Sequence, residues 1–300
     1  LCDSFDNSVK SSEEVEGFLQ LPTLATIPNF ALSRRASGRP GAARRAPAPA
    51  PHEGAGGLPT AASRAADIVV LHEPRSPAAE AFRTLRTALL FSTPGAPPKV
   101  ILLTSAGASE GKTVSSVNLA ASLAEAGSRV LLLDVDLRRP SCHRTLGIAN
   151  ERGLSSFLSG QEELANIVHV LDAPRISFVP AGPPPPNPAE LVGSARMHNA
   201  LEELRAEYDF VILDSPPVLP VTDAVVLARE ADGAVLVVKG HETPRELLRR
   251  ARDQLLHAGV HLLGAVVNNV DLRWGNHYFY SRYYGGYDPT DAPAVEEEQA

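Results

Sequence analysis

Residue types that define several common protein classes are scarce in this chain of 300 residues. It has two cysteines, Cys2 and Cys142, which lie far apart and not at the spacing of a metal-binding motif. We therefore expect two free thiols in a reducing compartment rather than a disulfide. The formal net charge of −7 argues against nonspecific nucleic-acid binding by the whole chain, so we expect no nucleic-acid partner.

Long hydrophobic runs are also missing. No apolar stretch approaches the ~20 residues that a membrane-spanning helix needs, and the first residues lack the pattern of a signal peptide. The sequence begins at Leu1, and its only methionine is Met197. We therefore expect a soluble piece of a longer protein, and this expectation leaves room for a membrane-spanning region upstream.

One segment is locally basic and has no periodicity. Residues 33–66 are dominated by Ala, Pro, Gly and Arg, a composition that cannot bury enough apolar surface to offset chain entropy. We predict a disordered linker there, and we favour a solvated linker over a patch that touches anionic lipid headgroups. Its arginines cluster in the first half, at Arg34, Arg35, Arg39, Arg44 and Arg45.

Regular hydrophobic patterns lie on both sides of this linker. In residues 1–32, Ser11 and Glu14 have the spacing of a capping box, and an apolar helical stripe and a short extended piece follow. In residues 67–272, helical patterns cover 80–91 and 112–126. Apolar runs typical of buried parallel strands lie at residues 100–104, 130–134, 176–179, 210–214, 234–238 and 262–267. Strands that alternate with helices predict an α/β fold with a doubly wound, mostly parallel sheet.

A phosphate-binding loop follows the first strand of the second region. The run 105–113 ends in Gly-Lys-Thr and leads directly into a helix, which is the context of a P-loop. Backbone N–H groups at a helix start bind phosphate, Lys112 adds a positive charge, and the Thr113 hydroxyl binds Mg²⁺. We therefore predict ATP and Mg²⁺ as ligands, and an exposed turn without a ligand is the alternative. The predicted nucleotide-binding residues are Gly107, Ala108, Ser109, Glu110, Gly111, Lys112, Thr113 and Val114.

This loop departs from the strict pattern at its start. Ala106 stands where the motif has its first glycine, and we expect Gly107 to supply the flexibility that the loop needs.

Three carboxylates follow strand ends, at the edge where open α/β sheets bind ligands. Asp134 and Asp136 stand at i and i+2, and on an extended segment both side chains would share one face. Asp214 ends the strand at 210–214, which is a Walker B position. Desolvating like charges together is unfavourable, so we expect Mg²⁺ with Thr113, Asp136 and Asp214 as ligands. A capping or turn role is the alternative for each carboxylate.

Together these motifs resemble the bacterial tyrosine kinases (BY-kinases) of capsule and exopolysaccharide systems. The resemblance covers roughly residues 67–290. It rests on the P-loop, on the hydrophobic-Asp-x-Asp-x-Arg run that ends at Arg138, on Arg-Arg-Pro-Ser at 138–141, and on Asp-Ser-Pro-Pro at 214–217. Those kinases are the cytoplasmic domains of polysaccharide co-polymerases. The family usually carries Pro-Gly where Ala108 and Ser109 stand here, which we expect to change affinity or rate more than nucleotide binding itself.

The resemblance also implies roles for individual residues. Lys112, Asp134, Asp136 and Asp214 would be catalytic, and Asn268 matches a strand-end asparagine that reads adenine in related ATPases. An E-x-x-R-x-x-R motif used in ring-like self-association matches Glu80, Arg83 and Arg86. The same three charges would also suit ordinary i,i+3 pairing on a helix surface.

Partners and location follow from the same resemblance. Residues 6–10 look like the segment just after the second membrane helix of a co-polymerase, which implies a membrane-anchored chain-length-determinant region upstream. The implied partners are further copies of the chain in a ring-like homo-oligomer, a tyrosine phosphatase, and the machinery of polysaccharide polymerisation and export. The implied location is the cytoplasmic face of the bacterial inner (plasma) membrane.

The end of the chain holds a tyrosine cluster. Five of its six tyrosines fall within residues 278–287, followed by an acidic end. Tyrosines in a Gly-rich segment bury poorly, so we predict a flexible tail, 273–300, that carries autophosphorylation sites rather than a packing arm. The predicted sites are Tyr278, Tyr280, Tyr283, Tyr284 and Tyr287.

Three functions compete for this combination of motifs. The leading prediction is an ATP-dependent protein-tyrosine autokinase that regulates polysaccharide polymerisation and export. A P-loop switch ATPase of the plasmid-partitioning or division-site type would use the same sheet, but it has no reason to carry clustered tyrosines. A nucleotide-binding regulator with little turnover is the third. Neither H-R-D nor D-F-G occurs, which excludes eukaryotic-type kinase chemistry.

Overall fold

The computed structural model describes residues 8–9, 11–29 and 68–271. The predicted linker at 33–66 and the tyrosine cluster at 278–287 lie outside these residues. Among the described residues, none of the helices is both long enough and apolar enough to cross a membrane.

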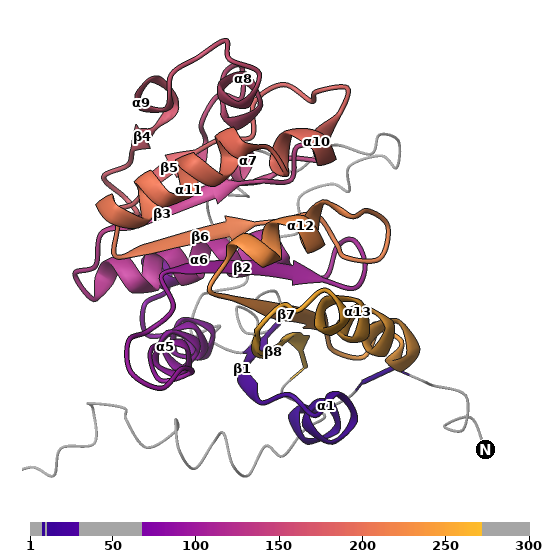
Figure 1. Cartoon of the computed structure of the whole chain (residues 1–300). Coiled ribbons are helices and arrows are strands. Elements are labelled where there is room, and N and C mark those ends of the chain that lie inside the picture. Colours follow the sequence, from indigo (N-terminus) through magenta and orange to yellow (C-terminus); the bar gives the residue numbers. More distant parts are fainter. Residues whose placement is uncertain (1–7, 10, 30–67, 272–300) are drawn as a thin grey trace, which may run out of the picture. The chain divides into compact units, whose positions relative to one another are not determined.

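An eight-stranded sheet runs through the described part of the chain (Figure 1). The strands lie in the order β1-β8-β7-β2-β6-β3-β5-β4, and every neighbouring pair is parallel except β4 and β5. Their bounds are β1 Thr23–Pro28, β2 Val100–Ser105, β3 Val130–Asp134, β4 His169–Val170, β5 Ser177–Val179, β6 Phe210–Asp214, β7 Gly233–Lys239 and β8 Leu262–Val270. The predicted doubly wound, mostly parallel sheet is confirmed.

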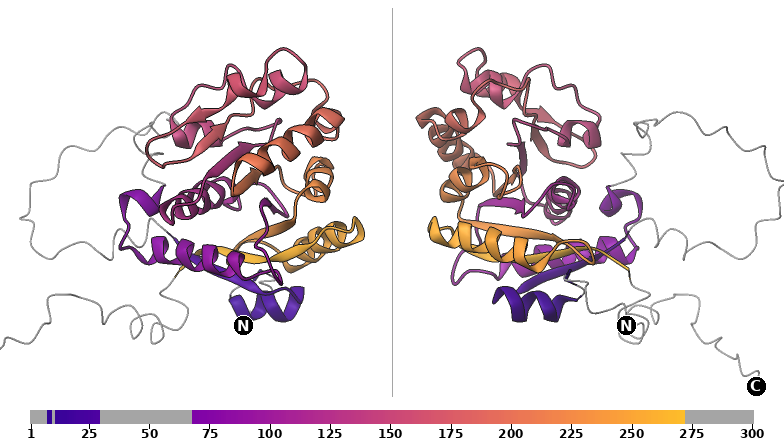
Figure 2. Two further views of the ribbon diagram at one scale, coloured as in Figure 1. Left: turned by 60° about the vertical axis from the view of Figure 1, so that its left-hand side comes forward. Right: turned by 90° about the vertical axis from the view of Figure 1, so that its right-hand side faces the viewer.

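Helices cover both faces of this sheet (Figure 2). One face is covered by α4 Val69–His72, α5 Pro77–Leu90, α6 Lys112–Glu125 and α7 Cys142–Leu146. The other is covered by α1 Ser12–Leu19, α8 Leu154–Leu158, α9 Leu164–Ile167, α10 Pro188–Val192, α11 Ala195–Glu207, α12 Asp223–Glu230 and α13 Arg245–His257.

Residues of the central strands alternate between the two cores. In β2, Val100 and Leu102 belong to the core beneath α11–α13, whereas Ile101 and Leu103 belong to the core beneath α5 and α6. Every residue of β2 is buried. Burial on both faces explains the uninterrupted apolar strands in the sequence, because neither face has to meet water.

The opening segment adds an edge strand to the same sheet. The Ser11 hydroxyl accepts the N–H of Glu14 at 3.3 Å, as the predicted capping box requires, and α1 then packs against α13. The extended piece is β1, which pairs in parallel with β8. Helix α1 and strand β1 therefore build on the sheet and cover one end of it.

Candidate nucleotide and phosphoryl-transfer site

The P-loop connects β2 to α6 at the carboxyl edge of the sheet. Gly111 caps α6 with φ at +94°, a left-handed conformation that favours glycine. A Cβ atom at this position would lie 1.8 Å from Nδ2 of Asn268, so the loop has no room for a side chain there. Two constraints, one on the backbone angle and one on space, therefore require Gly111.

The start of the loop differs from the sequence expectation. Ala106 is fully buried in the core, and Gly107 does not adopt a positive φ. The loop residues that do so are Ser109, at +63°, and Gly111. Gly107 therefore does not form the left-handed turn of the loop, which lies two residues further along.

Glu110 forms one hydrogen bond within the loop and one to strand β8. Its Oε1 accepts the N–H of Gly107 at 3.0 Å, and its carbonyl oxygen accepts Nδ2 of Asn268 at 3.0 Å. Burial raises the pKa of the Glu110 carboxyl to about 7, while the Gly107 N–H and the nearby Lys112 act in the opposite direction. Asn268 thus supports the loop from the end of β8, and its role as a reader of adenine stays a prediction.

Asp214 lies at the centre of a buried polar cluster. Its carboxylate accepts hydrogen bonds from the hydroxyls of Thr113 at 2.7 Å and Ser116 at 2.9 Å, and from the thiol of Cys142 at 3.1 Å. Asp134, Cys142 and Asp214 offer ligand atoms that all lie within 4.8 Å of one another. Cys142 is a free thiol, as the sequence predicts, but the sequence gives no signal for its contact with Asp214 because the two residues lie 72 positions apart.

The two carboxylates of the Asp-x-Asp motif lie in different environments. Strand β3 ends at Asp134, which is fully buried and accepts the N–H groups of Ser141 and Cys142, both at 3.0 Å. Asp136 follows the strand and is half-buried at the wall of a cavity. The two carboxylates of the motif therefore differ in burial, with Asp134 in the interior and Asp136 at the cavity.

Burial and charge act together on the inner carboxylates. Burial raises the pKa of Asp134 well above its ordinary value, and the neighbouring Asp214 raises it further. Burial also raises the pKa of Asp214, against the hydrogen bond from Thr113 and the charge of Lys112. Such a pair requires a proton or a cation for neutrality, and carboxylate and hydroxyl oxygens are suitable ligands for Mg²⁺.

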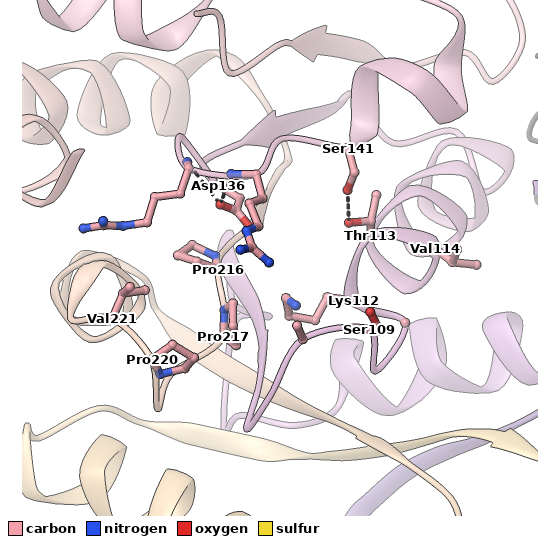
Figure 3. A pocket seen from close by; sticks show the side chains of 14 residues that line it. Ser109, Lys112, Thr113, Val114, Asp136, Ser141, Pro216, Pro217, Pro220 and Val221 are labelled. Carbon is pink, nitrogen blue, oxygen red and sulfur yellow. Dashed lines mark hydrogen bonds between the residues drawn. The ribbon is translucent and has the colours of Figure 1, made fainter. Parts of the chain in front are cut away.

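A cavity of about 730 Å³ lies beside the P-loop (Figure 3). The P-loop and the start of α6 form one side, with Ser109, Lys112 and Thr113. The remaining lining residues are Ala108, Gly111, Val114, Asp136, Arg138, Arg139, Ser141, Pro216, Pro217, Pro220 and Val221. The Ser141 hydroxyl lies 2.7 Å from that of Thr113.

Arg138 connects the Asp-x-Asp loop to the segment after β6. Its Nε and Nη2 bond to the two carboxylate oxygens of Asp223 at 2.8 and 3.0 Å, and Asp223 is 1% exposed. This bidentate pair fixes the first residue of α12 against the loop that follows β3. The arginine of the sequence motif is therefore engaged within the chain.

The predicted oligomer residues lie on α5, away from the cavity. Arg83 pairs with Glu80 at 3.1 Å and with Glu125 at 3.6 Å. Arg86 donates to the carbonyl oxygen of Ser122 at 2.7 Å. The i,i+3 pairing that the sequence left open is present, and self-association through this face stays a prediction.

Comparisons with known proteins identify the family of this chain. Residues 99–243 match the family model described as an AAA domain. Tyrosine-protein kinase YwqD of Bacillus subtilis (strain 168) is 37% identical over 222 residues, which cover 74% of this chain and 92% of YwqD. The solved kinase domain of the Escherichia coli tyrosine kinase ETK superimposes with a TM-score of 0.74 at 31% identity, covering 88% of this chain and 96% of that one.

The switch ATPases share the fold at a greater distance. The septum site-determining protein MinD of Pyrococcus horikoshii, solved with Mg-ADP, matches 57% of this chain and 70% of its own at 23% identity and a TM-score of 0.50. The fold is thus that of a P-loop NTPase, which binds a nucleotide. The higher identity and coverage lie with the kinases, and the chain belongs to the family of bacterial tyrosine-protein kinases.

Proposed function

We propose that this kinase transfers the γ-phosphoryl group of ATP, with Mg²⁺, to tyrosines of its own C-terminal cluster. The observation that carries the proposal is the position of Lys112 and Thr113 at one cavity, with the Thr113 hydroxyl bonded to the buried carboxylate of Asp214. Magnesium, when bound, neutralises charge on the phosphates during transfer.

Residues in and beneath the cavity have different proposed roles in the transfer. Lys112 and the N–H groups at the start of α6 bind and polarise the phosphates. Thr113, Asp136 and Asp214 would hold the metal, and the buried pair of Asp134 and Asp214 provides negative charge that a cation offsets. Asp136 is the carboxylate at the cavity wall, so we assign it to orient the tyrosine hydroxyl and accept its proton.

The acceptors and partners extend the proposal beyond the described residues. We propose Tyr278, Tyr280, Tyr283, Tyr284 and Tyr287 as acceptors. We also propose a homo-oligomer with contacts through α5, regulation of capsular or exopolysaccharide polymerisation at the inner membrane through an anchored chain-length-determinant region, and reversal by a tyrosine phosphatase. The support for this part is the family membership and the density of tyrosines in the last residues.

A lysine substitution tests the chemistry. Lys112→Met removes the fixed charge at the phosphates, so phosphotyrosine formation should fall at least 100-fold and nucleotide affinity should weaken markedly. Lys99→Met is the matched control, because Lys99 lies just before β2, at the opposite end of that strand from the P-loop. Labelled ATP and acid-stable phosphotyrosine analysis provide the measurement. Undiminished phosphotyrosine in Lys112→Met would exclude this cavity as the centre of transfer.

A further inference from the structure

The cavity has a second side that phosphates cannot use. Opposite the P-loop it is lined by Pro216, Pro217, Pro220 and Val221 (Figure 3). Three of these four residues have no backbone N–H, and none has a polar side chain. Phosphates need several hydrogen-bond donors and positive charge, and this apolar wall offers no charged side chain and at most the one backbone N–H of Val221.

The apolar wall is held rigidly in place by the strand that also leads into the P-loop. The Thr104 hydroxyl donates to the carbonyl oxygen of Pro216 at 2.9 Å, and Val218 donates its N–H to the Ser105 carbonyl at 2.8 Å. Val218 is fully buried and anchors the segment in the core. Wall and P-loop therefore keep a fixed separation, because both are attached to the end of β2.

The far end of the wall is fixed as well. Asp223, two residues after Val221, forms the bidentate pair with Arg138 described above. Both ends of the segment 215–222 are thus fastened, although Pro220 is exposed and Pro217 and Val221 are half-exposed at the cavity. In the described part of the chain no other element covers these apolar groups at the cavity, which favours a ligand with an apolar body.

We infer that this apolar wall is the subsite for the aromatic ring of the acceptor tyrosine, an inference that rests on the proposed function. The ring lies on the prolines and Val221, and the hydroxyl points toward Asp136 on the same cavity. A tyrosine is suited to both surfaces, because it joins an apolar body to a polar tip. In the transfer, the tyrosine oxygen forms a bond to the γ-phosphorus, the bond between that phosphorus and the bridging oxygen breaks, ADP leaves, and the hydroxyl proton passes to Asp136.

The subsite also accounts for the choice of tyrosine over serine or threonine. An aliphatic hydroxyl would leave the apolar wall uncovered and would carry no ring to bridge the distance to the P-loop side. Apolar contacts of this size discriminate by roughly 10- to 200-fold, so the wall acts on the acceptor and leaves nucleotide binding unaffected.

Two wall substitutions test the inference. Val221→Asn places an amide on the wall, and Pro220→Ser changes an exposed residue whose replacement does not threaten folding. Val170→Asn is the matched control, because Val170 is 80% exposed on β4, at the far edge of the sheet. We expect the KM for a tyrosine-containing peptide to rise about tenfold in both wall variants, with the KM for ATP unchanged. Unchanged peptide KM, or a parallel rise in the KM for ATP, would overturn the assignment.

A binding measurement tests the subsite independently of phosphoryl transfer. A peptide with phenylalanine in place of the acceptor tyrosine has the ring and no reactive oxygen. We expect it to bind nucleotide-loaded protein, by fluorescence anisotropy, more tightly than the serine peptide, and to lose about tenfold in affinity in Val221→Asn. Equal binding of the phenylalanine and serine peptides would refute the subsite even if tyrosine is phosphorylated. Ring-dependent binding without any phosphotyrosine would instead support the subsite and contradict the proposed function.

Discussion

Ser109 carries a side chain at a backbone position that favours glycine. Its φ is +63°, and the left-handed region costs a non-glycine residue on the order of 1 kcal/mol. The family pattern has Pro-Gly where Ala108 and Ser109 stand, so the glycine that would relieve this cost is missing here. The loop therefore holds strain beside the phosphate site.

Ser109→Gly should raise the free energy of unfolding by about 0.5–1 kcal/mol, because relief of the left-handed strain outweighs the added freedom of the unfolded chain. Urea denaturation provides the measurement. Ser128→Gly is the control, since Ser128 has no positive φ and no unusual backbone to relieve. That control should lower stability by a few tenths of a kcal/mol. If Ser109→Gly lowered the free energy of unfolding, as the control should, the strain argument would be contradicted.

Glu110 makes stability depend on pH in a definite direction. Burial raises the pKa of this carboxyl in the folded protein from 4.5 to about 7. Between these values the folded state binds more protons than the unfolded state, so this group's stabilising contribution is present at low pH and is lost as pH rises through 7. Glu110→Gln should remove that dependence and raise the free energy of unfolding at pH 8 by on the order of 2 kcal/mol, with little change at pH 5.

Denaturation curves at pH 5, 6, 7 and 8 measure the effect of Glu110→Gln. Glu203→Gln is the control, because Glu203 is exposed on α11. Its curve should follow that of the wild type at every pH. Parallel pH profiles for wild type and Glu110→Gln would show that the buried carboxyl does not titrate in this range.

Residues that a local motif marks could be predicted from the sequence, whereas residues that a turn of the chain brings into the site could not. Lys112 and Thr113 are recognisable because their spacing fixes them at a helix start. Cys142 and Ser141 lie in the site only because the chain after β3 turns back over Asp134. A local pattern carries no information about that turn.

At the scale of elements, the long buried strands were predictable and the short connecting helices were not. Residues 130–134 and 210–214 coincide with β3 and β6, since a strand buried on both faces is marked by its own apolar run. The helix predicted to begin at residue 80 begins at Pro77, because Ser76 caps it. Helices α7 to α10, none longer than five residues, have too few turns to show a periodicity, and tertiary contacts alone define them.

Helix α1 depends on arginines of α13. Arg252 donates to the carbonyl oxygens of Leu19 at 3.0 Å and Phe18 at 3.5 Å, where helix α1 ends. Arg249 stacks on the Phe18 ring at 4.7 Å, and Arg245 pairs with Glu14 at 2.8 Å. These contacts attach an eight-residue helix that would not be stable alone.

Arg252→Ala should therefore loosen α1 locally. Hydrogen exchange of the amides of α1 should accelerate roughly tenfold, corresponding to a loss of about 1.4 kcal/mol in local stability, while exchange in α6 stays unchanged. Arg250→Ala is the control, because Arg250 is exposed on the same helix. Equal acceleration in α1 and α6 would mean that the substitution weakens the whole fold instead.

At the scale of the whole molecule, the question is whether transfer occurs between copies. The cavity lies at the carboxyl edge of the sheet, and the α5 face carries the residues proposed for self-association. Copies held together would place one chain's acceptors near another's site at high effective concentration. Arg83 pairs within its own chain, yet its side chain is only partly buried and can be shared with a neighbour.

Mixing two defective chains distinguishes transfer between copies from transfer within one chain. A Lys112→Met chain with its tyrosines is incubated with a chain truncated before His277 that keeps its site. Phosphotyrosine should appear on the Lys112→Met chain, and its rate should fall on dilution. Arg83→Ala in both chains should lower the rate several-fold, whereas Arg75→Ala, which changes an exposed arginine just before α5, should not. An unmodified Lys112→Met chain at high protein concentration would mean that transfer stays within one chain.

The two edges of the sheet, β1 and β4, have features that hinder strand pairing with another molecule. At one edge β1 is preceded by Pro22 and ends at Pro28, and a proline has no N–H to donate to an incoming strand. At the other edge β4 has two residues and runs antiparallel to β5, which gives an added strand little to pair with. Open sheet edges are templates for amyloid-like pairing when molecules are concentrated. For the self-association proposed above, both edges of the sheet therefore carry features that disfavour strand pairing between copies.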